Sequence, residues 1–564
     1  EVTLPNFKTN YRKLISWVLT GRRPIYATIA SFFLLIFTIA LMGIVKPKVV
    51  FFPAGDPDYI YIYAKNPIGT DAVVTDSVTK VIEKRVFSFL NKEGYSKIVN
   101  SVISNVGKNA GDPMQPDRGA TPHKSKVTIA FEKLQLRGGI ATGEILTKIQ
   151  ADFAKNPLPG VELAIERERN GPPTGKPISI EIAGDEFTVL QDLEKKVRAA
   201  ITKSGIQGIQ ELKSDLVTNK PEIIIDVNRE KASREGISSA QVAMAVRTGL
   251  FGAEISKFRD VKDEYPIQLR LKGDSRNQIE KLLQMNITYR DMNMGGALRQ
   301  VPLNSIADIR YATSFSQINR KDQERVITLG SDVIQGYNAN EIVGELTTLF
   351  EEIDVPQGYK IRMGGEQEDQ KESGAFLGMA FLAALILIYL ILATQFNSAV
   401  KPLIIFATIL LSLIGVLLGF MAFGMTFSVI MSGVGIIALA GIVVKNGILL
   451  IEFIEELRFK RGYDLKEAII EGGGIRLTPV LLTASAAVLG LIPLALGLSI
   501  DFAAMFTELN PHIFIGSDSA VFWGILAWTI IFGLTFSTIL TLVIVPCMYY
   551  ISERIKQKWF TKSV

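Results

Sequence analysis

The stretch IIALAGIVVKNGILLI, from Ile436 to Ile451, is apolar except for Lys445 and its neighbour Asn446. With its flanks it is long enough to cross a bilayer. A lysine at bilayer depth is energetically costly, so such residues usually face a partner or a water path. No other strongly apolar segment carries an Asp or Glu near its middle, and Glu452 lies about 10 Å further along the helix. We therefore expect a polypeptide outside this sequence to supply the counter-charge, and Lys445 to belong to a charge relay.

Composition places the chain among membrane proteins with a large soluble region. Of its 564 residues, 48% are hydrophobic, and these concentrate at the N-terminal edge and in the last third. The formal net charge of +5 is small for this length and does not favour nucleic-acid binding. The one cysteine, Cys547, lies in an apolar segment, so disulfides are not expected.

Six segments are long and apolar enough to span a membrane. They are expected at Pro24–Val45, Ala375–Phe396, Pro402–Phe423, Phe427–Phe453, Leu477–Leu498 and Val521–Tyr550. Basic residues precede the first segment, separate the fourth from the fifth and follow the sixth, whereas the loop after the fifth has none. By the positive-inside rule, both termini are expected in the cytoplasm, and the long region between the first two segments is expected to be exported.

The region between the first two spans alternates strand and helix patterns. Residues 47–172 predict the order β-α-β-β-α-β, which is the ferredoxin-like order. A second such set occupies residues 173–218 and 313–373, and it is interrupted by a block with its own strands and helices at residues 219–312. The expected fold is therefore a multi-pass α-helical membrane protein with six transmembrane helices and a large α+β region. The other ranges are expected as an amphipathic cytoplasmic segment (1–23), the first transmembrane helix (24–46), five further transmembrane helices (374–550) and a cytoplasmic tail (551–564).

Four motifs resemble those of one family. They are FFPAGDPDYIYIYAKNPIGT (Phe51–Thr70), GGEQEDQKESG (Gly364–Gly374), GIVVKNGILLIEF (Gly441–Phe453) and RLTPVLLT (Arg476–Thr483). Over essentially its whole length, the chain resembles the C-terminal half of a resistance-nodulation-division (RND) efflux transporter, with the hydrophobe/amphiphile efflux branch the best match. The resemblance implies that the two ferredoxin-like sets are periplasmic porter subdomains and that the inserted block is a docking subdomain.

The resemblance also implies a proton relay. Lys445 matches the family's tenth-span lysine, which pairs with two aspartates of the fourth span, and Arg476 and Thr483 match polar residues of the eleventh span. The residues themselves agree, because Arg476 and Thr483 lie seven positions apart, on one face of a helix. Plainer interpretations stay open: a snorkelling Lys445, an interfacial Arg476, and a Thr483 hydroxyl bonded to its own helix. Asn446 either bonds to a neighbouring span or helps to hold the site.

Two departures from the family bear on the substrate. The acidic pair is missing because the first half is missing, and the stretch Ser104–Phe131 keeps only Phe131 as a candidate aromatic for substrate binding. Small amphiphilic or hydrophobic compounds are the expected substrates. A soft metal ion is the alternative, since methionines occur in the exported region. These methionines are Met114, Met285, Met292, Met294 and Met363.

The expected function is that of a proton-motive-force-driven secondary transporter, an efflux pump of the multidrug-resistance kind. No phosphate-binding GxxxxGK[ST] motif, metal cluster or nucleophile–base pair occurs, so we expect neither a cofactor nor an enzyme. A membrane-embedded protein-export or assembly accessory component is the competing interpretation. The resemblance implies a bacterial inner-membrane location, a homotrimer of proton antiporters, and as partners the missing N-terminal half, a periplasmic adaptor, an outer-membrane channel and lipids. The loop Asp501–Asp518 is expected to be interfacial or lid-like.

Overall fold

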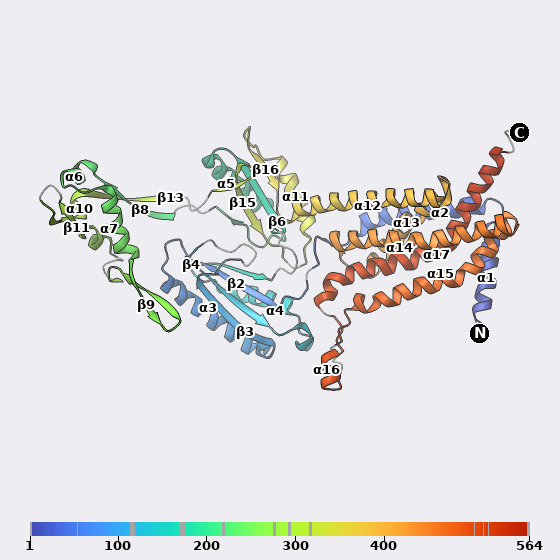
Figure 1. The fold of residues 1–564 in the computed structure, drawn as a ribbon, viewed down its shortest axis with the longest axis horizontal. Coiled ribbons are helices and arrows are strands. Elements are labelled where there is room, and N and C mark those ends of the chain that lie inside the picture. Colours follow the sequence, from blue (N-terminus) through green and yellow to red (C-terminus); the bar gives the residue numbers. More distant parts are fainter. Residues whose placement is uncertain are drawn as a thin grey trace. The chain divides into compact units, whose positions relative to one another are not determined.

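The computed structural model describes residues 3–53, 55–112, 119–168, 175–216, 220–273, 278–291, 295–314, 318–334, 336–500, 502–510, 513–516 and 518–560. The chain divides into two compact units (Figure 1). The first comprises Glu1–Asp215 and Asn319–Val564, and the second comprises Leu216–Ile318.

Six helices in the described chain are long and apolar enough to cross a membrane, as the sequence predicts. They are α2 (Arg23–Val45), α12 (Glu366–Phe396), α13 (Val400–Ala422), α14 (Val429–Glu455), α15 (Leu465–Leu496) and α17 (Asp518–Phe560). Several extend beyond the expected apolar segments. The polar stretch EQEDQKESG forms the first turns of α12, and α17 continues to Phe560 through most of the expected tail. Apolarity predicts only the part of a helix that suits hydrocarbon, whereas the backbone hydrogen bonding continues into the polar flanks.

Helices α13, α14 and α17 pack closely because glycines remove side chains where they meet. A Cβ on Gly415 or Gly419 of α13 would overlap Phe536 or Phe532 of α17. A Cβ on Gly533 of α17 would likewise overlap Leu439 of α14. Such small-residue contacts let helices approach closely, as in the small-xxx-small pattern of membrane proteins.

The N-terminal helix α1 (Thr3–Val18) lies against this bundle through one apolar side. Ile15 and Leu19 are buried, and the Tyr11 hydroxyl donates a 2.8 Å hydrogen bond to the Leu542 carbonyl. Arg12 pairs with Glu471 of α15 at 2.7 Å. A turn at Gly21, which has positive φ, then leads into α2, and Pro24 suits the first turn of that helix.

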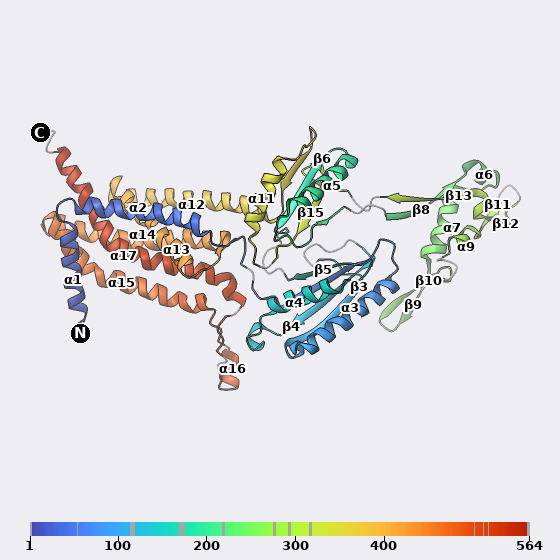
Figure 2. The same cartoon turned by 180° about the vertical axis from the view of Figure 1, so that it is seen from behind.

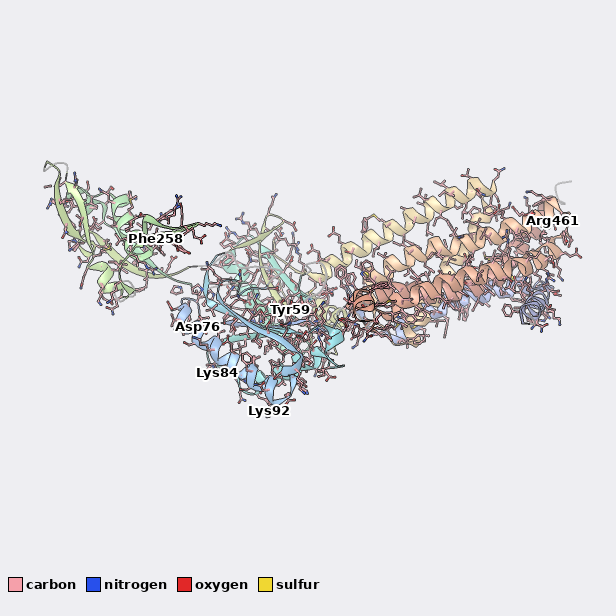
Figure 3. All side chains as sticks on the ribbon, turned by 60° about the horizontal axis from the view of Figure 1, so that its bottom comes forward. Tyr59, Asp76, Lys84, Lys92, Phe258 and Arg461 are labelled. Carbon is pink, nitrogen blue, oxygen red and sulfur yellow. The ribbon has the colours of Figure 1, made fainter. Side chains whose placement is uncertain are left out.

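The first sheet has the order β3-β4-β2-β5, and all of its neighbouring strands are antiparallel. Its strands are β2 (Tyr59–Lys65), β3 (Val99–Gly107), β4 (Thr121–Phe131) and β5 (Glu162–Arg167). In β2 the alternation YIYIYAK turns Ile60 and Ile62 into the core and the tyrosines to the other face. Helices α3 (Ala72–Lys92) and α4 (Thr142–Lys155) complete that core, and Asp76, Lys84 and Lys92 lie along α3 (Figure 3).

The second sheet has the order β14-β15-β6-β16, and β7 pairs with β15. Its strands are β6 (Ile178–Gly184), β7 (Lys213–Ser214), β14 (Asn319–Lys321), β15 (Glu324–Ser331) and β16 (Lys360–Met363). Helices α5 (Phe187–Ser204) and α11 (Ala339–Glu351) belong to the same unit. Gly205 and Gly208 have positive φ and turn the chain between α5 and the short strand β7.

Within its described residues, the second unit contains three two-stranded sheets (Figure 2). The pairs are β8 (Lys220–Val227) with β13 (Ala307–Ser314), β9 (Ala253–Asp260) with β10 (Asp263–Leu269), and β11 (Asn286–Asp291) with β12 (Ala297–Pro302). Its described helices are α6 (Arg229–Arg234), α7 (Ser239–Phe251), α9 (Ile279–Leu283) and α10 (Leu303–Ile306). A small core around Val242, Ile287 and Leu303 holds α7 against these strands.

Candidate functional site

Helix α14 begins at a well-formed cap and carries the candidate site near its middle. The Ser428 side chain accepts a hydrogen bond from the Met431 N–H and donates a 2.9 Å bond to the Phe51 carbonyl. Phe427 and Ser428 form the short strand β17, which pairs with β1 (Val49–Val50) after α2. The start of α14 is therefore fixed to the end of α2.

Helix α14 is covered on one side only. Its covered side is held close to its neighbours: a Cβ on Gly435 would lie 2.9 Å from Thr529, and one on Gly447 would lie 3.3 Å from Ile405. The other side, which we call the open face, is left exposed by this chain. It consists of Val434, Ala438, Gly441, Ile442 and Lys445, which recur at helical spacing.

Lys445 lies on the open face as its one charged member. Within the described residues, no hydrogen bond or ion pair involves its side chain. It lies 16 residues after Val429 and 10 before Glu455, so about 24 Å and 15 Å of helix separate it from the two ends of α14. A lysine side chain is too short to bring its ammonium to either end of the helix. The charge therefore stays near the middle of the apolar segment.

Asn446 points differently from Lys445. Successive helical residues are about 100° apart, and Asn446 is only 5% exposed, on the covered side of the helix. The two residues are thus neighbours in sequence but do not share a face.

Helix α15 runs antiparallel to α14 and brings Arg476 beside it. The Arg476 guanidinium lies 4.5 Å from the centre of the Phe453 ring, which is a cation–π distance. The Nε of Arg476 is buried and has no hydrogen-bond partner in the described chain. A buried donor without an acceptor is energetically costly, so Arg476 needs a hydrogen-bond acceptor that the described residues do not supply.

Thr483 lies at nearly the same depth as Lys445. Phe453 and Arg476 are level with each other, and in antiparallel helices seven residues back along α14 and seven forward along α15 lead to Asn446 and Thr483. The Thr483 hydroxyl donates a 3.0 Å hydrogen bond to the Val480 carbonyl of its own helix, the plainer of the two arrangements expected for it. Thr483 is exposed, so this chain leaves both Thr483 and Lys445 uncovered at similar depth.

Phe131 is placed elsewhere. It ends β4, is 7% exposed and belongs to the core of the first sheet, with Arg137 over its ring. Its ring packs within that subdomain rather than lining a surface. Among the methionines considered for a soft metal, Met114, Met292 and Met294 lie outside the described residues. Met285 packs near Gly249.

The sequence did not reveal a cluster of ion pairs where α13, α14 and α17 meet. Lys401 pairs with Glu455, which also accepts a 3.3 Å hydrogen bond from the Tyr549 hydroxyl. Arg458, in the π-helical turn Glu456–Lys460, pairs with Glu553 at 2.5 Å. All four charged side chains are largely buried. Arg461, just after that turn, marks the tip of the helical bundle (Figure 3).

A bundle of six apolar helices with a large soluble region of mixed helix and strand is the fold of the resistance-nodulation-division transporters. The chain belongs to the AcrB/AcrD/AcrF family of this class, whose model matches residues 2–553.

Individual relatives differ in what they transport. The cobalt-zinc-cadmium resistance protein CzcA of Cupriavidus metallidurans is 30% identical over 416 residues, which are 73% of this chain and 37% of CzcA. The multidrug resistance protein MdtC of Yersinia pestis is 23% identical over 557 residues, which are 97% of this chain and 49% of MdtC. The crystal structure of a heavy metal efflux pump matches with a TM-score of 0.72 and 24% identity, covering 98% of this chain and 53% of that one. The chain thus spans about half the length of these relatives or less.

Proposed function

We propose that this chain is the C-terminal half of a proton-driven efflux transporter of the bacterial inner membrane. Lys445 carries the proposal: it is a mid-helix cation without a partner in the described chain, on a face that the described helices leave exposed. Acidic groups from the other half would lie against this open face and share protons with it. An intramembrane ionisable residue of this kind is typical of proton relays in transporters.

The neighbouring residues suit supporting roles. Thr483, level with Lys445, exchanges its intrahelical hydrogen bond for one to an arriving carboxylate or water. Arg476 gains the acceptor that its buried Nε lacks. Asn446, on the covered side, holds α14 in place rather than carrying protons. Protonation of the acidic partners releases Lys445 and lets α14 shift relative to the other half.

The soluble region then does the mechanical work. The two sheets act as porter subdomains whose separation opens and closes with the helices, and the second unit acts as the docking subdomain for an adaptor or an outer-membrane channel. Both termini lie in the cytoplasm and the sheets lie in the periplasm, in keeping with the basic residues around Arg461. Complete protomers assemble as trimers.

The test is proton-coupled efflux by the transporter containing both halves. Lys445→Met keeps the length of the side chain and removes its charge, and the matched control Ile442→Met lies one turn away on the same open face. In everted vesicles, substrate addition should collapse a pH gradient with the control and not with Lys445→Met, at equal protein levels. Wild-type coupling by Lys445→Met would reject the relay.

Small amphiphilic or hydrophobic compounds are the proposed substrates, and a soft metal ion is the second candidate, favoured by the 30% identity to CzcA. The two are separated by growth protection in cells that lack their own pumps, with Lys445→Met as the inactive control. Protection against detergents, bile salts and dyes supports the first. Protection confined to cobalt, zinc, cadmium, copper or silver ions supports the second.

A further inference from the structure

The loop that joins α15 to α17 is a structured projection. Ser499 and Phe514 exchange two backbone hydrogen bonds, of 2.9 and 3.0 Å, across its base. The Gly516 N–H adds a bond to the Leu496 carbonyl at the end of α15. Beyond this base lies the short helix α16 (Phe502–Thr507), labelled at the foot of the bundle in Figure 1.

The side chains at the surface of this projection are largely apolar. Phe502, Met505 and Phe506 stand at positions i, i+3 and i+4 of α16, the spacing of one helical face, and Leu509 follows just beyond the end of the helix. They are 65%, 42%, 80% and 90% exposed. Ile513 and Ile515, on either side of Phe514 where the chain returns toward α17, are exposed as well. Large apolar side chains gathered in this way mark a surface that meets another phase or partner.

The membrane is the nearest apolar phase. Only five residues lie between Leu496, the last residue of α15, and Phe502, so the two are at most about 22 Å apart along an extended chain. The apolar surface continues from the helices themselves, where Leu498 and Trp523 are exposed at the same end of α15 and α17. Tryptophan is typical of the membrane–water boundary.

The charges of the segment agree with this placement. Residues 497–520 contain Asp and Glu but no Lys or Arg, as expected for a short loop on the outward side. Their apolar side chains, rather than attraction to anionic headgroups, would bind a bilayer surface.

We propose that the described residues 499–500, 502–510 and 513–516 form a membrane finger, whose exposed side chains Phe502, Met505, Phe506 and Leu509 insert at the boundary between headgroups and acyl chains of the outward leaflet. The finger holds the outward ends of α15 and α17 at a set depth in the bilayer. The inference rests on the orientation given under the proposed function, which places this loop outside.

The test places an environment-sensitive NBD label on single cysteines in the two-half transporter. Phe506→Cys lies on the apolar face of α16, and the matched control Thr507→Cys lies one residue further on, toward the opposite side of the helix. The native Cys547 is buried, so the parent protein gives the background. In phosphatidylcholine nanodiscs, lipids brominated on the acyl chains should quench the label at position 506 several-fold more than the label at position 507. Leu509→Cys, at an exposed apolar position just beyond the helix, is the second variant should Phe506→Cys fold poorly.

Two results would overturn the finger. Water-like emission at both positions would show that the apolar side chains stay in solvent. A blue-shifted emission at position 506 that brominated lipid does not quench would show that protein covers it. The orientation is tested separately: a membrane-impermeant thiol reagent should reach Thr507→Cys from the outer side only, and labelling from the cytoplasmic side alone would reject the topology rather than the apolar contact.

Discussion

Removing the charge of Lys445 should have opposite effects on membrane insertion of α14 and on transport. The perturbation is Lys445→Met, which replaces an ammonium by a thioether of similar length. Because the described chain offers Lys445 no partner, the substitution breaks no hydrogen bond or ion pair among the described residues. Insertion of α14 should become more favourable, while coupled efflux should be lost.

The magnitude follows from the depth of the residue. Lys445 lies about 15 Å from the nearer end of α14, which leaves its ammonium within the hydrocarbon. A lysine at the centre of a spanning helix costs about 2.5–3.5 kcal/mol on insertion scales. A change of about 2.5–3.5 kcal/mol corresponds to a factor of about 70 to 400 in the ratio of inserted to excluded helix.

The assay is insertion of residues Val429–Glu455 as a test segment by the translocation machinery, scored by glycosylation of its flanks. Two control substitutions, one on each side of Lys445 along α14, test whether the effect depends on depth in the membrane. Glu452→Gln, three residues from the end of α14, should change the apparent insertion free energy by much less than Lys445→Met does. Val434→Lys, near the other end, should cost less than the native lysine does.

A small effect would refute the reasoning. If Lys445→Met changed insertion by less than about 1 kcal/mol, the ammonium would be reaching the interface, and no buried counter-charge would be needed. The transport result would then require another explanation even if efflux were lost.

Three further predictions concern stability, measured as thermal unfolding of the complete transporter. Gly533→Ala should destabilise it by about 1–3 kcal/mol, because the added methyl group would overlap Leu439. The control Gly344→Ala, in α11 outside the spanning helices and with nothing within 4 Å of the new carbon, should be neutral or slightly stabilising, and equal effects would contradict the packing. Lys126→Met should raise the melting temperature at neutral pH, because burial lowers the pKa of Lys126 despite the opposing charge of Asp112. This penalty is fully present below the lowered pKa and is lost as pH rises from there to the ordinary lysine pKa of about 10.4, so the gain should shrink toward pH ~10. A gain that persists there would point to packing instead. Arg458→Met and Glu553→Met should each lower the free energy of unfolding by up to about 3–5 kcal/mol, because each single change leaves a buried charge unpaired. The double variant should lose less stability than the sum of the two single variants. Additive losses would mean that the two side chains do not interact.

The sequence predicts the six apolar helices well and their ends poorly. A run of some 20 apolar residues has few alternatives to a spanning helix, so each predicted segment corresponds to a helix here. The first turns of α12 are polar and carry no such signal. Strand β9 and the turn into β10 escaped prediction for a related reason: SKFRDVKDEY mixes charge with isolated apolar residues and resembles a loop, whereas the pairing with β10 defines the strand.

Lys445 could be singled out because a charge in an apolar run is visible without a structure. The pairs Lys401–Glu455 and Arg458–Glu553 could not, because they join helices far apart in the sequence and each partner looks like an ordinary flanking charge. Phe131 illustrates the opposite case. An aromatic residue in the expected stretch suggests a binding surface, but strand alternation turns it into the core.

Apolarity alone does not distinguish a face that meets lipid from one that meets the other half of the transporter, but the glycines do. A methyl group added at Gly441 on the open face of α14, or at Gly490 on α15, would have nothing within 4 Å of it in the described chain. A glycine within a helix costs about 0.5–1 kcal/mol relative to alanine, and facing lipid it gains nothing in return. Facing another helix, it permits the close backbone approach that membrane helices use to associate. Gly441 lies one turn from Lys445, so the position that admits a neighbouring helix is also the position at which an acidic partner could reach the ammonium. The face that holds the unpartnered charge thus also carries a glycine that would let a second helix come close.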